Sequence, residues 1–320
     1  MGDWGSIMSK NPAPAELATA PAVKPPVKRA ARPLLGVLFM LLAGLAFVSQ
    51  SVSVKAVGQT VEPLQSLFLR YVLGLFFIIP FIPAMRRAGF QGRDASGHLA
   101  RSLLQAIASL LWFYALVHVP MAEVTSMGYL QPLYMTIGAA LFFGERLAAR
   151  RILAIVVALI GVCIVLRPGF REISSGQLAM LVQTPLMAAG YLLAKSLSAR
   201  TSPEAVLGWM SLLVPILLAP FALMSWQPVT LKELSIIFLS AMFSTIGHWG
   251  VLRALNAAPV AVTQPVIFLQ LIWSVAAGAL IFGEAVDKMV VLGGTVIVAA
   301  VVFIVIREHQ LAQMAKRGAA

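Results

Sequence analysis

Ten apolar blocks, each about the length of a membrane-crossing helix, fill most of this chain of 320 residues. They cover residues 34–54, 65–83, 99–117, 121–143, 151–167, 176–196, 205–223, 233–252, 259–282 and 289–306. About twenty apolar residues cross a hydrocarbon core of about 30 Å, because each helical residue rises about 1.5 Å. Since 60% of the residues are hydrophobic and 11% are charged, one soluble core could not bury them. The sequence therefore predicts an all-α integral membrane protein with ten transmembrane helices.

The breaks between the blocks define the predicted domain organisation. Residues 1–33 are rich in proline, which forbids a stable helix, and we expect a disordered cytoplasmic tail. Residues 34–168 hold the first five spans and residues 169–307 the second five. Residues 308–320 form a cytoplasmic C-terminal tail. Several linkers have only a few residues, so neighbouring helices form antiparallel hairpins.

The basic residues set the predicted orientation. Lys and Arg number 24 against 12 Asp and Glu, for a net charge of +12. With the N-terminus in the cytoplasm, 18 of the 24 lie on the inner side, 5 lie outside, and Arg70 lies within a span. Because basic loops stay in the cytoplasm, we place both termini there, in a bacterial inner membrane. The charge then serves topology and anionic lipid rather than nucleic acid.

An internal repeat appears when the sequence is shifted by about 140 residues. The matches are Lys55 with Lys195, Pro63 with Pro203, Pro120 with Pro259, Gln131 with Gln270, and Phe143-Gly144-Glu145 with Phe282-Gly283-Glu284. Each repeat holds an odd number of spans, so the second repeat must be inverted relative to the first. Inverted repeats are typical of secondary transporters, in which two related halves enclose one central site. A gene duplication without transport is the alternative interpretation.

Several motifs carry a family resemblance. They are Leu-Trp-Phe-Tyr-Ala-Leu at 111–116, Pro120-Met121-Ala122-Glu123, Gln131-Pro132-Leu133, the Phe-Gly-Glu triplets and Arg70. Over about residues 34–306 the chain resembles the drug/metabolite transporter superfamily, specifically the ten-helix permeases built from two EamA domains. The resemblance implies alternating access around a central cavity without ATP hydrolysis. It implies an exporter of amino acids or metabolites, or an importer of a compound such as S-adenosylmethionine or riboflavin.

Polar and aromatic side chains within the spans are the candidate substrate-binding residues. A polar group inside a bilayer must find a partner or line a wet cavity. The candidates are Gln131, Gln270, Tyr129, Trp112, Tyr191, His248, Gln264 and Gln105. Gln131 and Gln270 fall at matching depth in related helices, so we expect two amides reaching toward one substrate. The alternative is interhelical hydrogen bonding that only holds the bundle together.

Charged residues near the spans suggest further roles. Arg70 needs a partner or an aqueous path, and Glu123 is a candidate partner or a proton-coupling carboxylate. The alternative is a snorkelling arginine and a glutamate favoured at a helix start. Lys55 and Lys195 end their spans and are expected to anchor at the membrane interface. Glu145 and Glu284 are expected to have structural roles at the ends of theirs.

An enzyme is not expected. The four histidines are scattered, and no metal-binding, phosphate-loop or nucleophile motif is present. We therefore predict no cofactor and no metal site. A flippase for a lipid-linked substrate and a membrane-embedded enzyme remain as alternatives. The expected partners are a small-molecule substrate and the bilayer, with a homodimer as an open alternative to a monomer.

Overall fold

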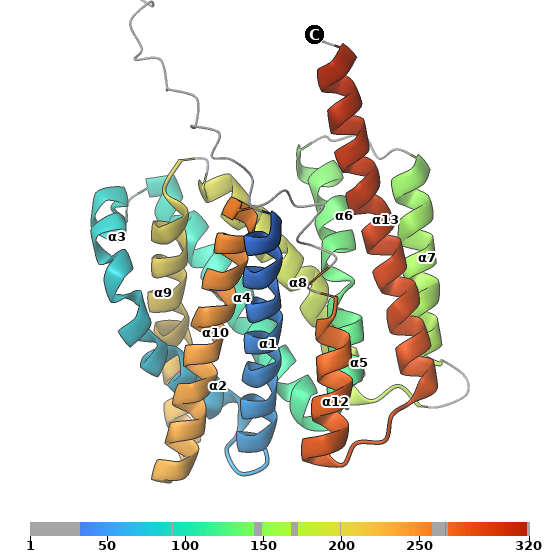
Figure 1. The fold of residues 1–320 in the computed structure, drawn as a ribbon. Coiled ribbons are helices and arrows are strands. Elements are labelled where there is room, and N and C mark those ends of the chain that lie inside the picture. The colour runs from blue at the N-terminus through green and yellow to red at the C-terminus, as the bar shows by residue number, and fades with distance from the viewer. Residues whose placement is uncertain are drawn as a thin grey trace, which may run out of the picture. The chain divides into compact units, whose positions relative to one another are not determined.

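In a computed structural model, residues 33–90, 92–143, 149–167, 172–198, 200–257, 266 and 268–318 are described. Within these ranges the chain is helical apart from short connections, and none of it is strand (Figure 1). The helices are α1 (Pro33–Val57), α2 (Pro63–Gly74), the 3-10 helix η1 (Leu75–Phe81), α3 (Ile82–Ala88), α4 (Gly92–His118), α5 (Met121–Gly128), α6 (Gln131–Phe143), α7 (Ala149–Leu166), α8 (Ser175–Ser198), α9 (Pro203–Met224), α10 (Leu231–Ala257), α12 (Gln270–Phe282) and α13 (Lys288–Gly318).

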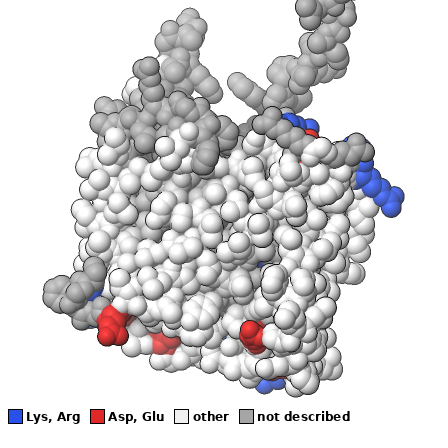
Figure 2. Space-filling view, turned by 180° about the vertical axis from the view of Figure 1, so that it is seen from behind, with Lys and Arg blue, Asp and Glu red and all other residues white. Residues whose placement is uncertain are grey.

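The described helices have the length and composition that a bilayer requires. Six helical segments, one of them formed by α2, η1 and α3 together, are long and apolar enough to cross a membrane, and three shorter apolar helices accompany them. On the face shown in Figure 2, charged side chains lie near the upper and lower rims of a broad uncharged band. The backbone groups of a helix are bonded within the helix except in its first and last turns, so helices can lie against lipid. The prediction of an all-α membrane protein is confirmed.

Proline sets several helix starts, as the sequence indicated. Pro63 and Pro203 each occupy the first turn of their helices, where a missing N–H leaves no bond unmade. The Ser202 hydroxyl caps α9 by accepting from the backbone N–H of Ala205 at 3.2 Å. At the C-terminus, helix α13 continues through Gly318, past the predicted end of the tenth span at residue 306. Of the predicted N-terminal tail, residues 1–32 lie outside the described residues.

The second, fourth and ninth predicted spans are interrupted within the described residues. The second consists of α2, η1 and α3, with Pro80 inside the 3-10 segment. The fourth breaks between α5 and α6, where Pro132 lacks the N–H that a continuous helix would direct at the carbonyl of Gly128. The second repeat has a matching turn before α12: Leu269 N donates to Val266 O at 3.1 Å, as Leu130 N donates to Met127 O at 3.1 Å.

The helix packing is that of two repeats related by a pseudo-two-fold axis. Helix α1 packs against α10, and their counterparts α8 and α4 pack against each other in the same way. Counterparts also pair directly, α2 with α9 and α7 with α13, and α5 packs against α12, the counterpart of α6. Helix α1 begins, and α13 ends, on one side of the bundle, which we call the terminal face (Figure 1). The opposite side, where α1 and α12 end, is the loop face.

The break between α5 and α6 and the turn before α12 meet at the centre of this arrangement. Tyr129 and Phe268 are equivalent positions of the two repeats, and their rings contact edge-to-face with centroids 5.0 Å apart. The Tyr129 hydroxyl also donates to the Phe268 carbonyl at 3.3 Å. Tyr129 therefore belongs to the interface between the repeats. Its predicted role as a cavity residue is not supported, because its hydroxyl is bonded across that interface.

Close packing of α7 on α13 gives a stability prediction. A Cβ added to Gly293 would lie 2.6 Å from the carbonyl oxygen of Gly161 and 2.7 Å from Val165 Cγ2. We expect Gly293→Ala to destabilise the fold by about 1–3 kcal/mol, because the backbone of α7 must move away. The midpoint of thermal unfolding in detergent should then fall by about 5 °C.

Gly190→Ala in α8 is the matched control. Its added Cβ would meet only Leu104 Cβ at 3.9 Å, an ordinary contact. We expect its midpoint to stay within about 1 °C of the parent, since alanine also favours the helix. Equal midpoints for the two variants would show that α7 and α13 do not pack this closely.

Candidate functional site

A cavity of about 1010 Å³ lies among helices of both repeats. At the terminal face its lining includes Phe81, Glu204 and Arg253, which lie near the ends of their helices. Toward the loop face it reaches Met180, about 8 Å into α8 at about 1.5 Å per residue. No described residue of the connections on the loop face lines it. The cavity is therefore open toward the terminal face and closed toward the loop face.

One polar stripe of α4 forms a wall of the cavity. It consists of Arg101, Gln105, Ser109 and Trp112, at spacings of three and four residues that place them on one helix face. Gln105 Nε2 donates to Ser109 Oγ at 2.9 Å. A facing stripe on α8 consists of Met180, Gln183, Met187 and Tyr191. The two stripes supply amides, hydroxyls and aromatic rings along the length of the cavity.

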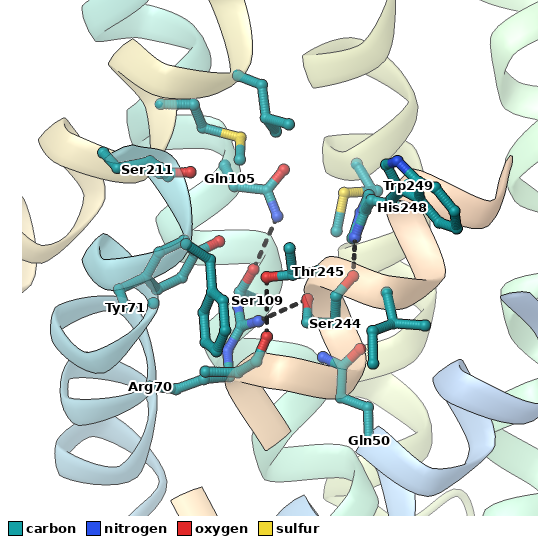
Figure 3. A pocket seen from close by; sticks show the side chains of 18 of the residues that line it. Gln50, Arg70, Tyr71, Gln105, Ser109, Ser211, Ser244, Thr245, His248 and Trp249 are labelled. Atoms are coloured by element: carbon teal, nitrogen blue, oxygen red, sulfur yellow. Dashed lines mark hydrogen bonds between the residues drawn. The ribbon is translucent and has the colours of Figure 1, made fainter. Parts of the chain in front are cut away.

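Arg70 lies in the deep part of the cavity, among side chains of α2, α4 and α10 (Figure 3). The side chain is 9% exposed, and its Nη1 donates to Ser244 Oγ at 3.0 Å. The guanidinium also lies 4.4 Å from the ring centroid of Tyr71 and 5.5 Å from that of Phe113. Its Nε has no hydrogen-bond partner among the described residues. The predicted aqueous path for Arg70 is therefore the cavity itself.

Arg101 is a second buried cation in the lining. It is 8% exposed, and its Nη1 donates to the carbonyl of Val206 at 2.8 Å, while its Nε has no partner among the described residues. The described lining holds three arginines, with Arg253 at the mouth, but a single carboxylate, Glu204. The interior of the cavity is therefore electropositive.

Polar groups of α10 complete the deep part. His248 Nδ1 donates to the Ser244 carbonyl at 2.7 Å, and its ring lies edge-on to Phe47 with centroids 5.2 Å apart. Ser244 thus binds Arg70 through its hydroxyl and His248 through its backbone, which fixes both side chains relative to α10 (Figure 3). Within the described residues, no group of three His, Cys, Asp or Glu could hold a metal ion.

An ion pair between Lys55 and Glu284 closes the loop face, and we call it the loop-face ion pair. The two side chains are 9% and 14% exposed. Lys55 Nζ also donates to the Val119 carbonyl at 2.9 Å, and the backbone N–H of Met121 donates to Glu284 Oε2 at 2.9 Å. The prediction that Lys55 anchors at the membrane interface is wrong, because a buried carboxylate of the other repeat holds its ammonium group.

The Phe282-Gly283-Glu284 triplet has a physical explanation in this ion pair. Gly283 ends α12 with a left-handed φ of 65°, a conformation that glycine adopts without strain. The turn brings Glu284 N to the Gly278 carbonyl at 3.0 Å and directs its carboxylate to Lys55. Lys55 Nζ lies 5.7 Å from the ring centroid of Phe282. Glu284 thus has the structural role that the sequence predicted, while Gly144, Glu145 and the Lys195 side chain lie outside the described part of the chain.

Two further polar contacts join the repeats near the loop face. Gln65 Nε2 donates to the Gln227 carbonyl at 2.7 Å, and Gln227 N donates to Gln65 Oε1 at 3.2 Å. Gln177 Nε2 donates to Glu123 Oε2 at 2.6 Å. Each contact links an element of the first repeat to one of the second. Together with the loop-face ion pair, they seal the cavity on this side.

The structure separates the predicted site residues into two groups. Gln131, Trp112, Tyr191, His248, Gln105 and Arg70 line the cavity. Tyr129, Gln270 and Glu123 are not among the described lining residues, and Gln264 lies outside the described residues. The expected pair of Gln131 and Gln270 is therefore not symmetric about the cavity. Arg70 and Glu123 do not pair with each other, because Ser244 holds the first and Gln177 is bonded to the second.

Sequence reasoning missed several lining residues. They include Gln50, Tyr71, Arg101, Ser109, Ser244 and Thr245. The spacing of Arg101, Gln105 and Ser109 could have revealed the polar face of α4. Arg101 is one of the 18 basic residues that the charge count places on the inner side of the membrane. The hydroxyls gave no signal, since serine and threonine are common in membrane helices.

Comparisons with known proteins agree with this architecture. The EamA-like transporter family matches the chain twice, over residues 34–167 and again over residues 174–306. A solved crystal structure covers 87% of this chain and 98% of its own, with a TM-score of 0.54 at 17% identity. At that identity the likeness concerns the fold alone.

Curated relatives span nearly the whole chain. A riboflavin transporter of Rhizobium johnstonii is 29% identical, covering 91% of this chain and 95% of its own. An S-adenosylmethionine uptake transporter of Rickettsia bellii is 23% identical, with coverages of 86% and 95%. A pseudopaline exporter of Pseudomonas aeruginosa is 24% identical, with coverages of 83% and 94%. The family resemblance that the sequence motifs carried is confirmed: the chain belongs to the EamA-like transporter family, as a multi-pass membrane transporter with two copies of the family domain.

Proposed function

We propose that this protein is a secondary carrier that moves a small ring-bearing metabolite across the bacterial inner membrane by alternating access. The observation that carries the proposal is one large cavity, built from both repeats and closed toward a single face. Two relatives are named for riboflavin and S-adenosylmethionine, and both compounds contain a planar heteroaromatic ring. Trp112, Tyr71 and Tyr191 offer aromatic surfaces on which such a ring could stack.

The charge distribution supports an orientation with the terminal face in the cytoplasm. The basic residues gather in the loops of that face, as cytoplasmic loops do. In this orientation both termini are cytoplasmic and the cavity opens inward. Substrate would enter or leave through the mouth near Glu204 and Arg253.

Alternating access requires a second form that is open at the loop face. The contacts that close this face all join one repeat to the other, so a rocking motion of the repeats would break them together. The same motion would close the terminal face by the pseudo-symmetry of the bundle. Substrate then meets one side of the membrane at a time, and no ATP is needed.

One chain supplies the entire described lining, so the proposed carrier works as a single copy. The homodimer suggested at the sequence level is a separate proposal. Cross-linking of the protein in its native membrane would test it without bearing on the transport route.

Counterflow in proteoliposomes tests the carrier proposal. Vesicles that are loaded with unlabelled riboflavin, S-adenosylmethionine or a related ring-bearing metabolite are diluted into the same compound carrying a label. We expect a transient accumulation of label inside without ATP, because a carrier exchanges one substrate molecule for another. If no compound accumulates above protein-free vesicles, the proposed function is wrong. A label that equilibrates without a transient excess would indicate a channel.

The cavity geometry predicts different effects for the two related glutamines. Gln131→Ala removes a hydrogen-bonding amide from the lining, and we expect KM for uptake to rise about 2- to 10-fold, as for one lost hydrogen bond. Gln270→Ala is the matched control, because Gln270 is not among the described lining residues. Its KM should stay within about 2-fold of the parent. Equal effects of the two variants would contradict this placement of the binding site.

Thiol labelling tests which face is open. Cys163 is the single cysteine, so Cys163→Ser with Ser109→Cys leaves one thiol inside the cavity. We expect a membrane-impermeant reagent to label it from the terminal face, in inside-out vesicles, and poorly from intact cells. Lys55→Met should raise labelling from intact cells at least about 5-fold, because it leaves Glu284 buried without its cation.

Lys288→Met is the matched control for this labelling. Lys288 is an exposed lysine at the start of α13 on the same face, so its removal should not change the labelling rate. Labelling from both faces in the parent protein, or equal rates for the two lysine variants, would show that the loop-face ion pair does not close the cavity.

A further inference from the structure

Two buried guanidinium groups of the described cavity lining have no carboxylate partner among the described residues. Arg70 and Arg101 form hydrogen bonds only to neutral oxygens among the described residues, a serine hydroxyl and a backbone carbonyl. Each also has an Nε without a partner. A buried cation of this kind is costly unless an opposite charge or water compensates it.

The described carboxylates lie elsewhere: Glu172 is exposed, and Glu233 accepts from the backbone N–H and the hydroxyl of Thr230. At the loop face Glu284 pairs with Lys55, Asp287 with Arg167, and Glu62 accepts from the Ser225 hydroxyl. Glu123 accepts from Gln177, and at the terminal face Asp94 pairs with Arg200. Glu204 is exposed at the mouth of the cavity. None of the described carboxylates therefore serves as a counter-ion for Arg70.

We infer that the substrate itself supplies this counter-ion: the cavity takes an organic anion, with a carboxylate or phosphate group at Arg70 and a planar ring beside it. This inference rests on the proposed carrier function and names its substrate class. Arginine binds such groups through two parallel N–H bonds. Nη1 of Arg70 is fixed by Ser244, while Nε is buried without a hydrogen-bond partner among the described residues. Ser109 and Gln105 lie close by and add neutral donors (Figure 3).

The aromatic lining sets the rest of the substrate class. Tyr71 stacks on the Arg70 guanidinium, and Trp112 lies one helical turn from Ser109 on the same face of α4. A ring attached to the anionic group would therefore find aromatic surfaces within the same part of the cavity. Arg101 lies about 12 Å before Ser109 along α4, on the side of the mouth. It would attract the anion as it enters from the terminal face.

Ring-matched ligand pairs test the inference on the unaltered protein. Flavin mononucleotide and riboflavin differ by one phosphate, as do adenosine 5′-monophosphate and adenosine. Binding to the purified full-length protein in detergent is measured by calorimetry at low salt. We expect the anionic member of at least one pair to bind about 10- to 100-fold more tightly than its neutral mate, as for one charge-assisted contact. If neither anionic member binds more tightly, the inference is overturned.

Variants locate the anionic group. Arg70→Gln should abolish the preference for the anionic member while changing the affinity for the neutral mate less than about 3-fold, and Arg70→Lys should retain part of it. Arg87→Gln is the matched control, since Arg87 is an exposed arginine of α3 outside the cavity. An unchanged preference in Arg70→Gln would overturn the assignment to Arg70. Should that variant fail to fold, the ligand pairs on the parent protein still decide the substrate class.

The counterflow assay keeps this inference separate from the carrier proposal. If riboflavin shows counterflow but flavin mononucleotide does not bind more tightly than riboflavin, the carrier proposal holds and the anion inference is wrong. If the anionic members bind tightly but no compound shows counterflow, the substrate class is supported and the carrier proposal is wrong.

Discussion

The hydrocarbon core of a bilayer offers no hydrogen-bond partner, and this constraint governs where the helices of the protein can be interrupted. An unpaired backbone group exposed to lipid costs several kcal/mol. The break between α5 and α6 and the turn before α12 are accordingly placed inside the bundle, where Tyr129 and Phe268 meet. The interior position of these breaks brings Gly128 and Gln131 to the cavity. The irregular backbone and the polar chamber therefore have a common cause.

The same constraint applies to charge. Arg70 and Arg101 are tolerated at membrane depth because both face a cavity that opens to water at the terminal face. Lys55 lies at the other end and is not among the described lining residues of this cavity, and there a carboxylate of the second repeat neutralises it. Among the described cations, Arg70 and Arg101 beside the cavity donate to neutral oxygens, whereas Lys55 and Arg167 at the loop face pair with carboxylates. The division gives the cavity its positive interior.

The sequence predicted the architecture well because hydropathy and proline positions are local signals. The ten blocks, the starts at Pro63 and Pro203 and the shift of about 140 residues fix the order and the inversion of the helices. The site was predicted less completely. Trp112 and His248 line the cavity, but Gln270 does not, although it is the repeat equivalent of Gln131. Repeat symmetry predicts depth in the membrane, whereas the lining depends on how the bundle is tilted in one conformation.

Long-range partners were beyond the reach of sequence reasoning. Nothing local in the sequence indicates that Lys55 meets a glutamate 229 residues later, or that Arg70 binds Ser244. These contacts arise because helices of one repeat pack against helices of the other around the pseudo-two-fold axis. A repeat alignment gives equivalent positions, but contacts between repeats join positions that are mostly not equivalent. Tyr129 and Phe268 are the exception, because they lie where the axis passes between the helices.

Glu284 has a consequence for how the protein moves. Its single carboxylate holds the end of α1 through Lys55 and the first N–H of α5 through Met121, while its own backbone is tied to α12. Contacts of Glu284 thus link three helices, and none of the three can separate from the others unless a contact of Glu284 breaks. Few arrangements keep only some of these contacts. The protein should therefore interconvert between two discrete conformations, with the loop face closed or open, and spend little time in partly open ones.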